Sequence, residues 1–218
     1  MDAIILAGGR GTRMNKDMPK ILVSARNKTI LSHQLNYLLP KVDNTVLALG
    51  HRAEEVTNYI KENYPSASIL SSIEKEPLGT GGAIKLALNH VKSDKVLILN
   101  GDDLTDIDLN SVSQIGEDTI CVARPRLPFG LVREKDGYAT FDEKPVLENE
   151  WVSCGWYVLD CATLRQHLPD KGSIEYEVFP KLKLRVHKHS GFWQTLNSEK
   201  DIQQFEERTQ VPSHIDEK

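Results

Sequence analysis

The sequence has few cysteines and no long apolar segment. Its three cysteines, Cys121, Cys154 and Cys161, are odd in number and form no CxxC pair, which argues against a disulfide framework and favours a reducing compartment. No run approaches the roughly eighteen apolar residues of a membrane-spanning helix, and the apolar N-terminal run lacks the basic lead-in of a secretory signal. We therefore expect a cytoplasmic protein with no membrane partner, in which two of the three cysteines, those in apolar strand-like contexts, are free and buried.

The chain also lacks an excess of basic residues. Its 27 Lys and Arg against 31 Asp and Glu give a formal net charge of −4, whereas a general nucleic-acid binder usually carries a basic stripe. We expect no nucleic-acid partner. The 218 residues, 39% hydrophobic and 27% charged, are typical of one globular domain, and no internal repeat is present.

The first twenty residues predict a phosphate-binding loop. Residues 3–7 are an apolar run too short for a helix and typical of a buried strand, and Gly8, Gly9 and Gly11 follow at once. Glycine allows successive backbone N–H groups to turn toward one anion, and Arg13 and Lys20 add positive charge. A simple tight turn is the alternative reading of the glycines.

This loop matches neither of the two commonest phosphate-binding patterns. The dinucleotide fingerprint needs a third glycine at position 14, where the chain has Met14. The P-loop closes with Gly-Lys-Ser/Thr, whereas this loop continues Gly11-Thr12-Arg13. A dinucleotide-dependent oxidoreductase is therefore poorly supported.

The first half of the chain alternates between strand-like and helix-like patterns. Apolar periodicity predicts helices over 29–39, 53–64 and 80–91 and strands over 45–49, 67–73 and 95–99. This order predicts an α/β fold with a mostly parallel sheet covered by helices on both faces. In such sheets ligands bind at the carboxyl ends of the strands, which here lead into the first loop, 74–82 and 100–103.

The second half has shorter strands, predicted over 119–122, 130–132, 138–141 and 151–159. Asp136-Gly137 is a two-residue hairpin signal. We expect this half to extend the sheet and fold over its open edge as the wall of a sugar pocket. Short helices are predicted over 162–168 and 175–182, and a capping pattern of Ser198 and Asp201 opens a last helix to about residue 208. The polar tail, residues 211–218, is expected to be loose.

Two further loops carry chemically informative residues. Residues 76–83, EPLGTGGA, place three glycines before a helix, where the backbone can approach a flat ligand; a flexible turn with a helix cap is the alternative. Asn100-Gly101-Asp102 follows a strand, and a carboxylate there suits Mg²⁺, which takes one or two carboxylates plus substrate oxygens. Asp103 is expected to be a cap or an outer group of that site.

Together these motifs resemble the sugar-1-phosphate nucleotidyltransferases over nearly the whole chain. The resemblance rests on LAGGRGTRM with Pro19-Lys20, on PLGTGGA, on Asn100-Gly101-Asp102, on Glu143-Lys144-Pro145 and on the GFWQ run at 191–194. It implies the nucleotide-diphospho-sugar transferase fold, a Rossmann-like, mostly parallel sheet flanked by helices with a smaller mixed β sugar-binding part. We expect a single domain over 1–210, with a nucleotide-binding half (1–115) and a sugar-binding half (116–210).

The resemblance also implies the reaction. A sugar 1-phosphate oxygen attacks the α-phosphorus of a nucleoside triphosphate, and pyrophosphate leaves, with Mg²⁺ as cofactor. Arg13, Lys20 and Asp102 are the expected catalytic residues, and Asp102 and, weakly, Asn197 the expected metal ligands. The expected nucleotide-binding residues are Leu6, Ala7, Gly8, Gly9, Gly11, Thr12, Arg13, Glu76, Pro77, Gly79, Thr80 and Gly82. The expected sugar-phosphate-binding residues are Asp103, Gly130, Glu143, Lys144, Ser153 and Glu175.

The choice of substrates stays open at this point. The EKEPLGTGGAIK run looks most like heptose- or mannose-1-phosphate guanylyltransferases, and the GFWQ run like glucose-1-phosphate cytidylyltransferases. GTP is favoured, with CTP and UTP as alternatives. Asn197 stands where relatives have an aspartate, and Ser153 where they usually have an asparagine. A catalytically weak nucleotide-sugar-binding protein is therefore a further alternative, and a homodimer is left open.

Overall fold

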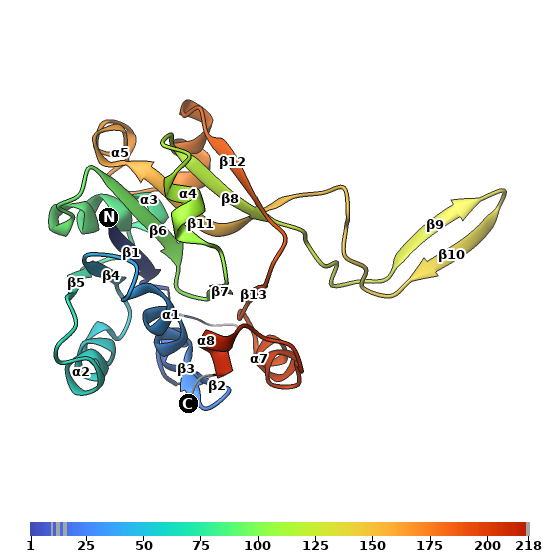
Figure 1. The fold of residues 1–218 in the computed structure, drawn as a ribbon, viewed down its shortest axis with the longest axis horizontal. Coiled ribbons are helices and arrows are strands. Elements are labelled where there is room, and N and C mark those ends of the chain that lie inside the picture. The colour runs from blue at the N-terminus through green and yellow to red at the C-terminus, as the bar shows by residue number, and fades with distance from the viewer. Residues whose placement is uncertain (10, 12–13, 15–16, 217–218) are drawn as a thin grey trace.

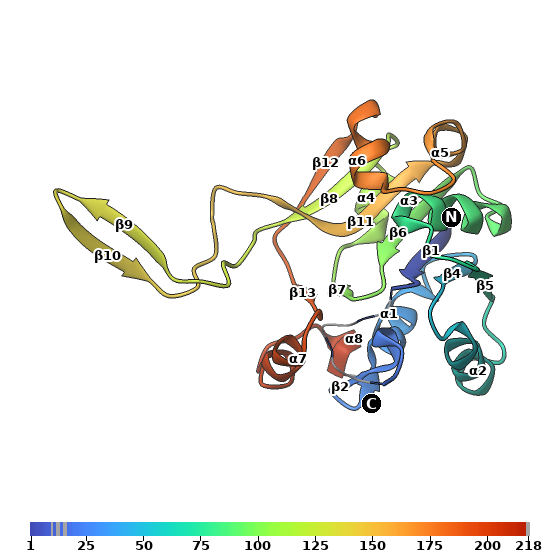
Figure 2. The same ribbon diagram turned by 180° about the vertical axis from the view of Figure 1, so that it is seen from behind.

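The computed structural model describes residues 1–216 except 10, 12, 13, 15 and 16. Figures 1 and 2 show a body built around a twisted sheet, from which a long hairpin projects. The predicted roles of Thr12 and Arg13 fall outside the described residues.

A seven-stranded sheet forms the centre of the body, in the order β12-β8-β11-β6-β1-β4-β5. The strand β11 is antiparallel to both of its neighbours, and every other pairing in the sheet is parallel. The predicted mostly parallel α/β sheet is confirmed. The strands are β1 (Asp2–Ala7), β4 (Thr45–Leu49), β5 (Ile69–Ile73), β6 (Lys95–Asn100), β8 (Thr119–Ala123), β11 (Val152–Asp160) and β12 (Arg185–His189).

Helices cover both faces of this sheet. Because side chains alternate along a strand, Ile5 and Leu97 pack on one face with α1 (Ile30–Leu38), α2 (Ala53–Asn63) and α4 (Leu109–Ser113). Ile4 and Ile98 pack on the other face with α3 (Gly79–Ala87), α5 (Cys161–His167) and α6 (Ile174–Glu177). Two 3-10 turns, η3 (Leu88–His90) and η4 (Phe179–Lys181), follow α3 and α6. Within the described part of the chain, no helix is long and apolar enough to cross a bilayer.

A smaller core joins the two ends of the chain. The strands β7 (Asp103–Thr105) and β13 (Trp193–Thr195) pair next to it, and η2 (Lys20–Leu22), β2 (Ser24–Ala25) and β3 (Lys28–Thr29) come from the N-terminal side. The helix α7 (Glu199–Glu206) begins with the predicted Ser198–Asp201 capping box. The buried residues of this smaller core include Met14, Val23, Ile30, Leu104, Leu196, Phe205 and Ile215.

The C-terminal tail differs from the expectation of a loose segment. Residues Ser213–Asp216 form a helix, α8, and Ile215 is 2% exposed because it packs into this smaller core. A single apolar residue in a polar segment is a weak sequence signal. Apolar periodicity therefore could not predict that α8 packs against the smaller core.

The three cysteines are free and buried, which was expected for two of them. Burial raises the pKa of Cys121 to about 12 and that of Cys161 to about 11, and it also raises the pKa of Cys154. These thiols stay protonated and act as small apolar groups.

The hairpin β9 (Leu131–Lys135) and β10 (Tyr138–Asp142) forms the outer part of a projecting arm, residues 124–148. Its turn residues Asp136 and Gly137 have φ of 53° and 81°, which confirms the predicted two-residue turn. The arm does not fold over the sheet edge as expected. Its stem, in which Leu127 N donates to Pro145 O over 3.0 Å, carries the hairpin outward, and residues 132–143 are exposed.

Candidate active site

The carboxyl ends of four neighbouring strands lie at one edge of the sheet. Gly8, Gly50, Glu74 and Gly101 follow β1, β4, β5 and β6 directly. Backbone hydrogen bonds tie these turns to the strands: Glu74 N donates to Leu49 O (2.9 Å) and Gly101 N to Leu6 O (2.8 Å). The predicted convergence of the loops at this edge is therefore present, and two adjoining cavities open there.

The larger cavity has a volume of about 750 Å³, which is in the range of small-molecule sites. It contains much of the predicted nucleotide-binding set: Leu6, Gly8, Gly9, Glu76, Pro77, Gly79 and Thr80. Its other lining residues are Ala48, Gly50, His51, Glu74, Lys75, Ala83, Asn100, Asp102 and Glu175.

The Glu74 carboxylate lies on the wall of the larger cavity against two glycines. A Cβ built on Gly50 would be 2.5 Å from Glu74 Oε1 and 2.8 Å from Gly8 O, and one built on Gly8 would be 3.0 Å from Glu74 Oε1, so the carboxylate packs closely on both glycines. Glu74 Oε2 accepts a hydrogen bond from Leu78 N over 3.1 Å, which fixes the side chain. A carboxylate held in this way offers Oε1 as an acceptor to a ligand that carries N–H groups.

The glycines of residues 79–82 allow close packing against a neighbouring loop, and one of them also lines the larger cavity. A Cβ on Gly82 would lie 2.4 Å from Asp170 O, and one on Gly79 would lie 2.4 Å from Gly172 O. Gly79 and Thr80 line the cavity, but the buried Gly82 packs against the loop between α5 and α6 and not against the predicted ligand space. Gly82 lines neither cavity, and close approach of backbone to backbone also requires glycine, so its contact with a nucleotide stays a prediction.

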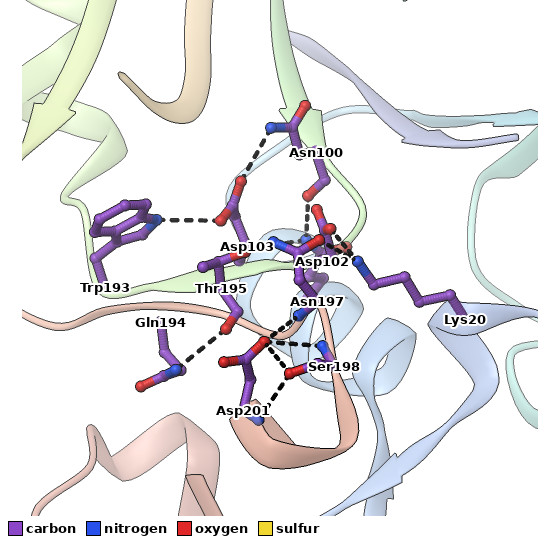
Figure 3. Close-up of polar contacts among 11 residues, drawn as sticks. Lys20, Asn100, Asp102, Asp103, Trp193, Gln194, Thr195, Asn197, Ser198 and Asp201 are labelled. Carbon is purple, nitrogen blue, oxygen red and sulfur yellow. Dashed lines mark hydrogen bonds and ion pairs between the residues drawn. The ribbon is translucent and has the colours of Figure 1, made fainter. Parts of the chain in front are cut away.

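The smaller cavity, of about 250 Å³, contains three residues that the sequence placed in separate loops. The Lys20 Nζ forms an ion pair with Asp102 and donates to Asn197 Oδ1 over 2.7 Å (Figure 3). Both cavities share Leu6, Gly9 and Asp102, so they meet at the ends of β1 and β6. The smaller cavity is lined by Leu6, Ala7, Gly9, Gly11, Lys20, Ile21, Gly101, Asp102 and Asn197.

The Asn197 amide is oriented by its neighbours. Its Nδ2 donates to Thr195 Oγ1 over 2.7 Å, so its Oδ1 faces Lys20. The backbone N–H of Asn197 donates to Asp201 Oδ2 (3.0 Å), and Leu196 N donates to Asp102 O (2.9 Å). The carboxylate and the amide oxygen are therefore held side by side, as a hard oxygen-binding cation requires.

Asp103 lies behind this pair and is 5% exposed. Its carboxylate accepts hydrogen bonds from Asn100 Nδ2 (3.0 Å) and Trp193 Nε1 (3.2 Å). Burial and then the charge of Asp102 raise the pKa of Asp103 to about 7. Asp103 thus joins β6, β7 and β13 under the site and lines neither cavity, and its contact with a sugar phosphate stays a prediction.

The other predicted sugar-phosphate residues are not gathered in one place. Gly130, Glu143 and Lys144 lie in the arm and line neither cavity, and a Cβ on Gly130 would meet the Phe141 ring. Ser153 Oγ lies 2.9 Å from Tyr157 Oη at the start of β11. Only Glu175 lines a cavity, the larger one.

Glu175 is also joined to the glycine-rich segment. Its carboxylate accepts hydrogen bonds from Thr80 Oγ1 (2.8 Å) and Ser173 Oγ (2.5 Å).

Sequence reasoning missed five polar or glycine residues of the larger cavity. Each of them lies in the first residues after a strand or in the strand's last position, which was the signal that could have found them. They are Gly50, His51, Glu74, Lys75 and Asn100.

Comparisons with known proteins agree with this geometry. The model of the family described as nucleotidyl transferase matches residues 2–192. A D-glycero-alpha-D-manno-heptose 1-phosphate guanylyltransferase of Campylobacter jejuni is 36% identical over 200 residues, which cover 85% of this chain and 90% of that protein. A mannose-1-phosphate guanyltransferase of Emericella nidulans is 32% identical, over 93% of this chain and 62% of that protein.

A solved structure is similar in fold over nearly the whole length. The crystal structure of HddC from Yersinia pseudotuberculosis complexed with GMP-PN superposes with a TM-score of 0.79 and 26% identity. The alignment covers 94% of this chain and 98% of that one.

Proposed function

Because this chain belongs to the nucleotidyl transferase family, as a sugar-1-phosphate nucleotidyltransferase, we propose that it transfers a guanylyl group from GTP to a heptose or hexose 1-phosphate. The products are a GDP-sugar and pyrophosphate. The observation that carries the proposal is the junction of the two cavities, where a nucleotide-sized space meets the Lys20–Asp102–Asn197 group. A triphosphate spanning this junction has its base in the larger cavity and its phosphates beside an ammonium group.

Guanine is favoured by the Glu74 carboxylate. The Watson–Crick edge of guanine carries two neighbouring donors, N1–H and the N2 amino group, whereas cytosine and adenine present one amino group beside an acceptor. A carboxylate accepts from both guanine donors and is repelled by the acceptors of the other bases. The named guanylyltransferase activities of the relatives, and the GMP-PN in the HddC crystal, support the same choice.

The donor set fits Mg²⁺. Asp102 supplies a carboxylate and Asn197 an oriented amide oxygen, and a bound triphosphate adds the oxygens that complete such a site. When bound, the ion neutralises charge on the phosphate oxygens. Asp102 and Asn197 would hold it.

The residues of the chain act mainly by positioning and by charge. An oxygen of the sugar phosphate attacks the α-phosphorus in line with the leaving pyrophosphate, so no covalent intermediate is required. Lys20 would bind phosphate oxygens at the reacting centre, and Arg13 the triphosphate and the leaving pyrophosphate. Lys144 would orient the sugar phosphate, with Glu143, Gly130, Ser153 and Glu175 near the sugar.

A substrate panel tests the proposal. Purified protein is incubated with each of the four ribonucleoside triphosphates, each paired with heptose, mannose or glucose 1-phosphate, and pyrophosphate release is measured. We expect release with GTP and a heptose or mannose 1-phosphate to exceed release with every other triphosphate. Faster turnover with CTP or UTP would instead identify a cytidylyl- or uridylyltransferase.

The same panel separates catalysis from binding alone. Asn197 contributes no charge to the cation site, and the arm holds Lys144 away from the cavities, so a nucleotide-sugar-binding protein without useful turnover is the second candidate. Tight binding of GTP or a GDP-sugar, measured by calorimetry, together with no pyrophosphate release from any pair, would favour it.

The arm supports a homodimer. An isolated two-stranded ribbon is only marginally stable in water, so the arm would gain stability by packing against another chain. Phe129, Tyr138 and Phe141 are 75%, 80% and 64% exposed, and symmetric homodimers are the commonest assemblies.

Replacement of residues 129–142 by a short Gly-Ser turn is expected to convert the dimer to a monomer with unchanged circular dichroism of the body. Light scattering after size exclusion measures the mass. A monomeric intact protein, or an unchanged mass in the shortened one, contradicts this assignment.

A further inference from the structure

The donors assigned to Mg²⁺ already hold a cation of the protein itself. The Lys20 ammonium contacts both the Asp102 carboxylate and Asn197 Oδ1, the latter over 2.7 Å (Figure 3). The Lys20 and Asp102 side chains are only 15% and 23% exposed, so water and salt screen their attraction less than on an open surface. A divalent ion that uses these oxygens must displace this ammonium group.

Only the outer part of the Lys20 side chain is free to move. Lys20 begins η2, and the buried Ile21 and Leu22 anchor that turn in the core. A Cβ on Gly11 would lie 3.0 Å from Lys20 Cβ, so the base of the side chain is packed against the loop. Rotation about the remaining bonds can move Nζ from Asp102 to a nearby phosphate oxygen without moving the backbone.

The backbone of Asp102 and both the backbone and the side chain of Asn197 stay tied when Lys20 moves. Leu196 N ties the Asp102 backbone, and Thr195 and Asp201 hold the Asn197 side chain and backbone. Once Nζ leaves, a preformed pair of oxygens with one negative charge remains. That pair suits a hard divalent cation.

We propose that the Lys20 ammonium group occupies the metal site of the nucleotide-free protein. The bound triphosphate attracts this ammonium group and so displaces it from the site. The inference rests on the proposed function, since it concerns the same triphosphate and the same metal. Lys20 then lowers metal affinity before the nucleotide arrives and binds phosphate afterwards. Because linkage is reciprocal, metal and triphosphate raise each other's affinity.

Metal binding to the nucleotide-free protein tests this directly. Mn²⁺ replaces Mg²⁺, and its free concentration is followed by electron paramagnetic resonance. Removing the competing ammonium in Lys20→Met is expected to tighten Mn²⁺ binding roughly fivefold, the effect of one partly shielded ion pair. Lys75→Met, which removes a neighbouring positive charge that makes no contact with Asp102, is the matched control and should change the Mn²⁺ affinity less than Lys20→Met does.

A non-hydrolysable GTP analogue supplies the second measurement. In the wild-type protein, Mn²⁺ is expected to strengthen analogue binding, and this coupling should shrink in Lys20→Met, where no ammonium has to move. Thermal melting checks that the variant is folded. Equal Mn²⁺ affinity of the wild-type and Lys20→Met proteins would overturn the inference while the magnesium assignment stands. If neither protein binds Mn²⁺, with or without the analogue, the magnesium assignment fails and the inference with it.

Discussion

Asp102→Asn is expected to lower the rate of pyrophosphate release by about 10²- to 10³-fold at saturating GTP and sugar phosphate. The change keeps the shape of the side chain and removes the negative charge that Asp102 places on the shared wall of the two cavities next to Lys20. The variant loses both the carboxylate proposed to hold Mg²⁺ and the partner of the Lys20 ammonium. Steady-state kinetics over a range of Mg²⁺ concentrations measures the loss.

The control for this variant is Asp170→Asn, the same change at an exposed aspartate that pairs with Lys85. It should keep wild-type turnover. Thermal melting of Asp102→Asn should show a folded protein, because the backbone hydrogen bonds around residue 102 do not involve its side chain. A folded Asp102→Asn protein with a rate within about tenfold of wild type would contradict the role assigned to Asp102.

The second large effect is expected at Glu74. Glu74→Gln keeps an oxygen that can accept from Leu78 N, but it places an amide N–H₂ or a neutral oxygen where guanine donates. Because a hydrogen bond to a charged group is worth about 1.5 to 3 kcal/mol, kcat/KM for GTP should fall about 10- to 100-fold.

Inosine triphosphate isolates the contact in question, because it has the N1–H of guanine and lacks the N2 amino group. The wild-type protein should prefer GTP to inosine triphosphate, and Glu74→Gln should lose most of that preference. Glu54→Gln, at an exposed position of α2, is the matched control. An unchanged ratio of the two kcat/KM values in Glu74→Gln would remove Glu74 from base recognition.

Much of the central sheet could be predicted because its strands are buried on both faces. The runs 45–49 and 95–99 are almost purely apolar, and in the structure they form β4 and most of β6. The alternation with helices then determined that the sheet is mostly parallel. The direction of the arm could not be predicted. Asp136-Gly137 defines a hairpin turn, but no local pattern states whether Val132 and Phe141 pack on the body, and both are exposed.

The site could be predicted in parts and not as an assembly. The sequence predicted three residues of the site, each from a separate segment: Lys20, Asp102 and Asn197. The smaller core between the chain ends brings these residues within hydrogen-bonding distance. Glu74 was missed because its only signal is its position directly after a strand, which many residues without a binding role share. For Gly82 the sequence does not separate the two roles, because a glycine next to a ligand and a glycine next to another loop look alike in sequence.

Lys20 and Asn197 are 177 residues apart in the chain. On the ribosome, β1, β4, β5 and β6 and the glycine loops leave the exit tunnel long before α7 and the turn that carries Asn197. A nascent chain therefore contains every described strand that borders the larger cavity before it contains a complete Lys20–Asp102–Asn197 group. Full assembly of the proposed phosphate-handling centre has to wait until Asn197 has left the tunnel.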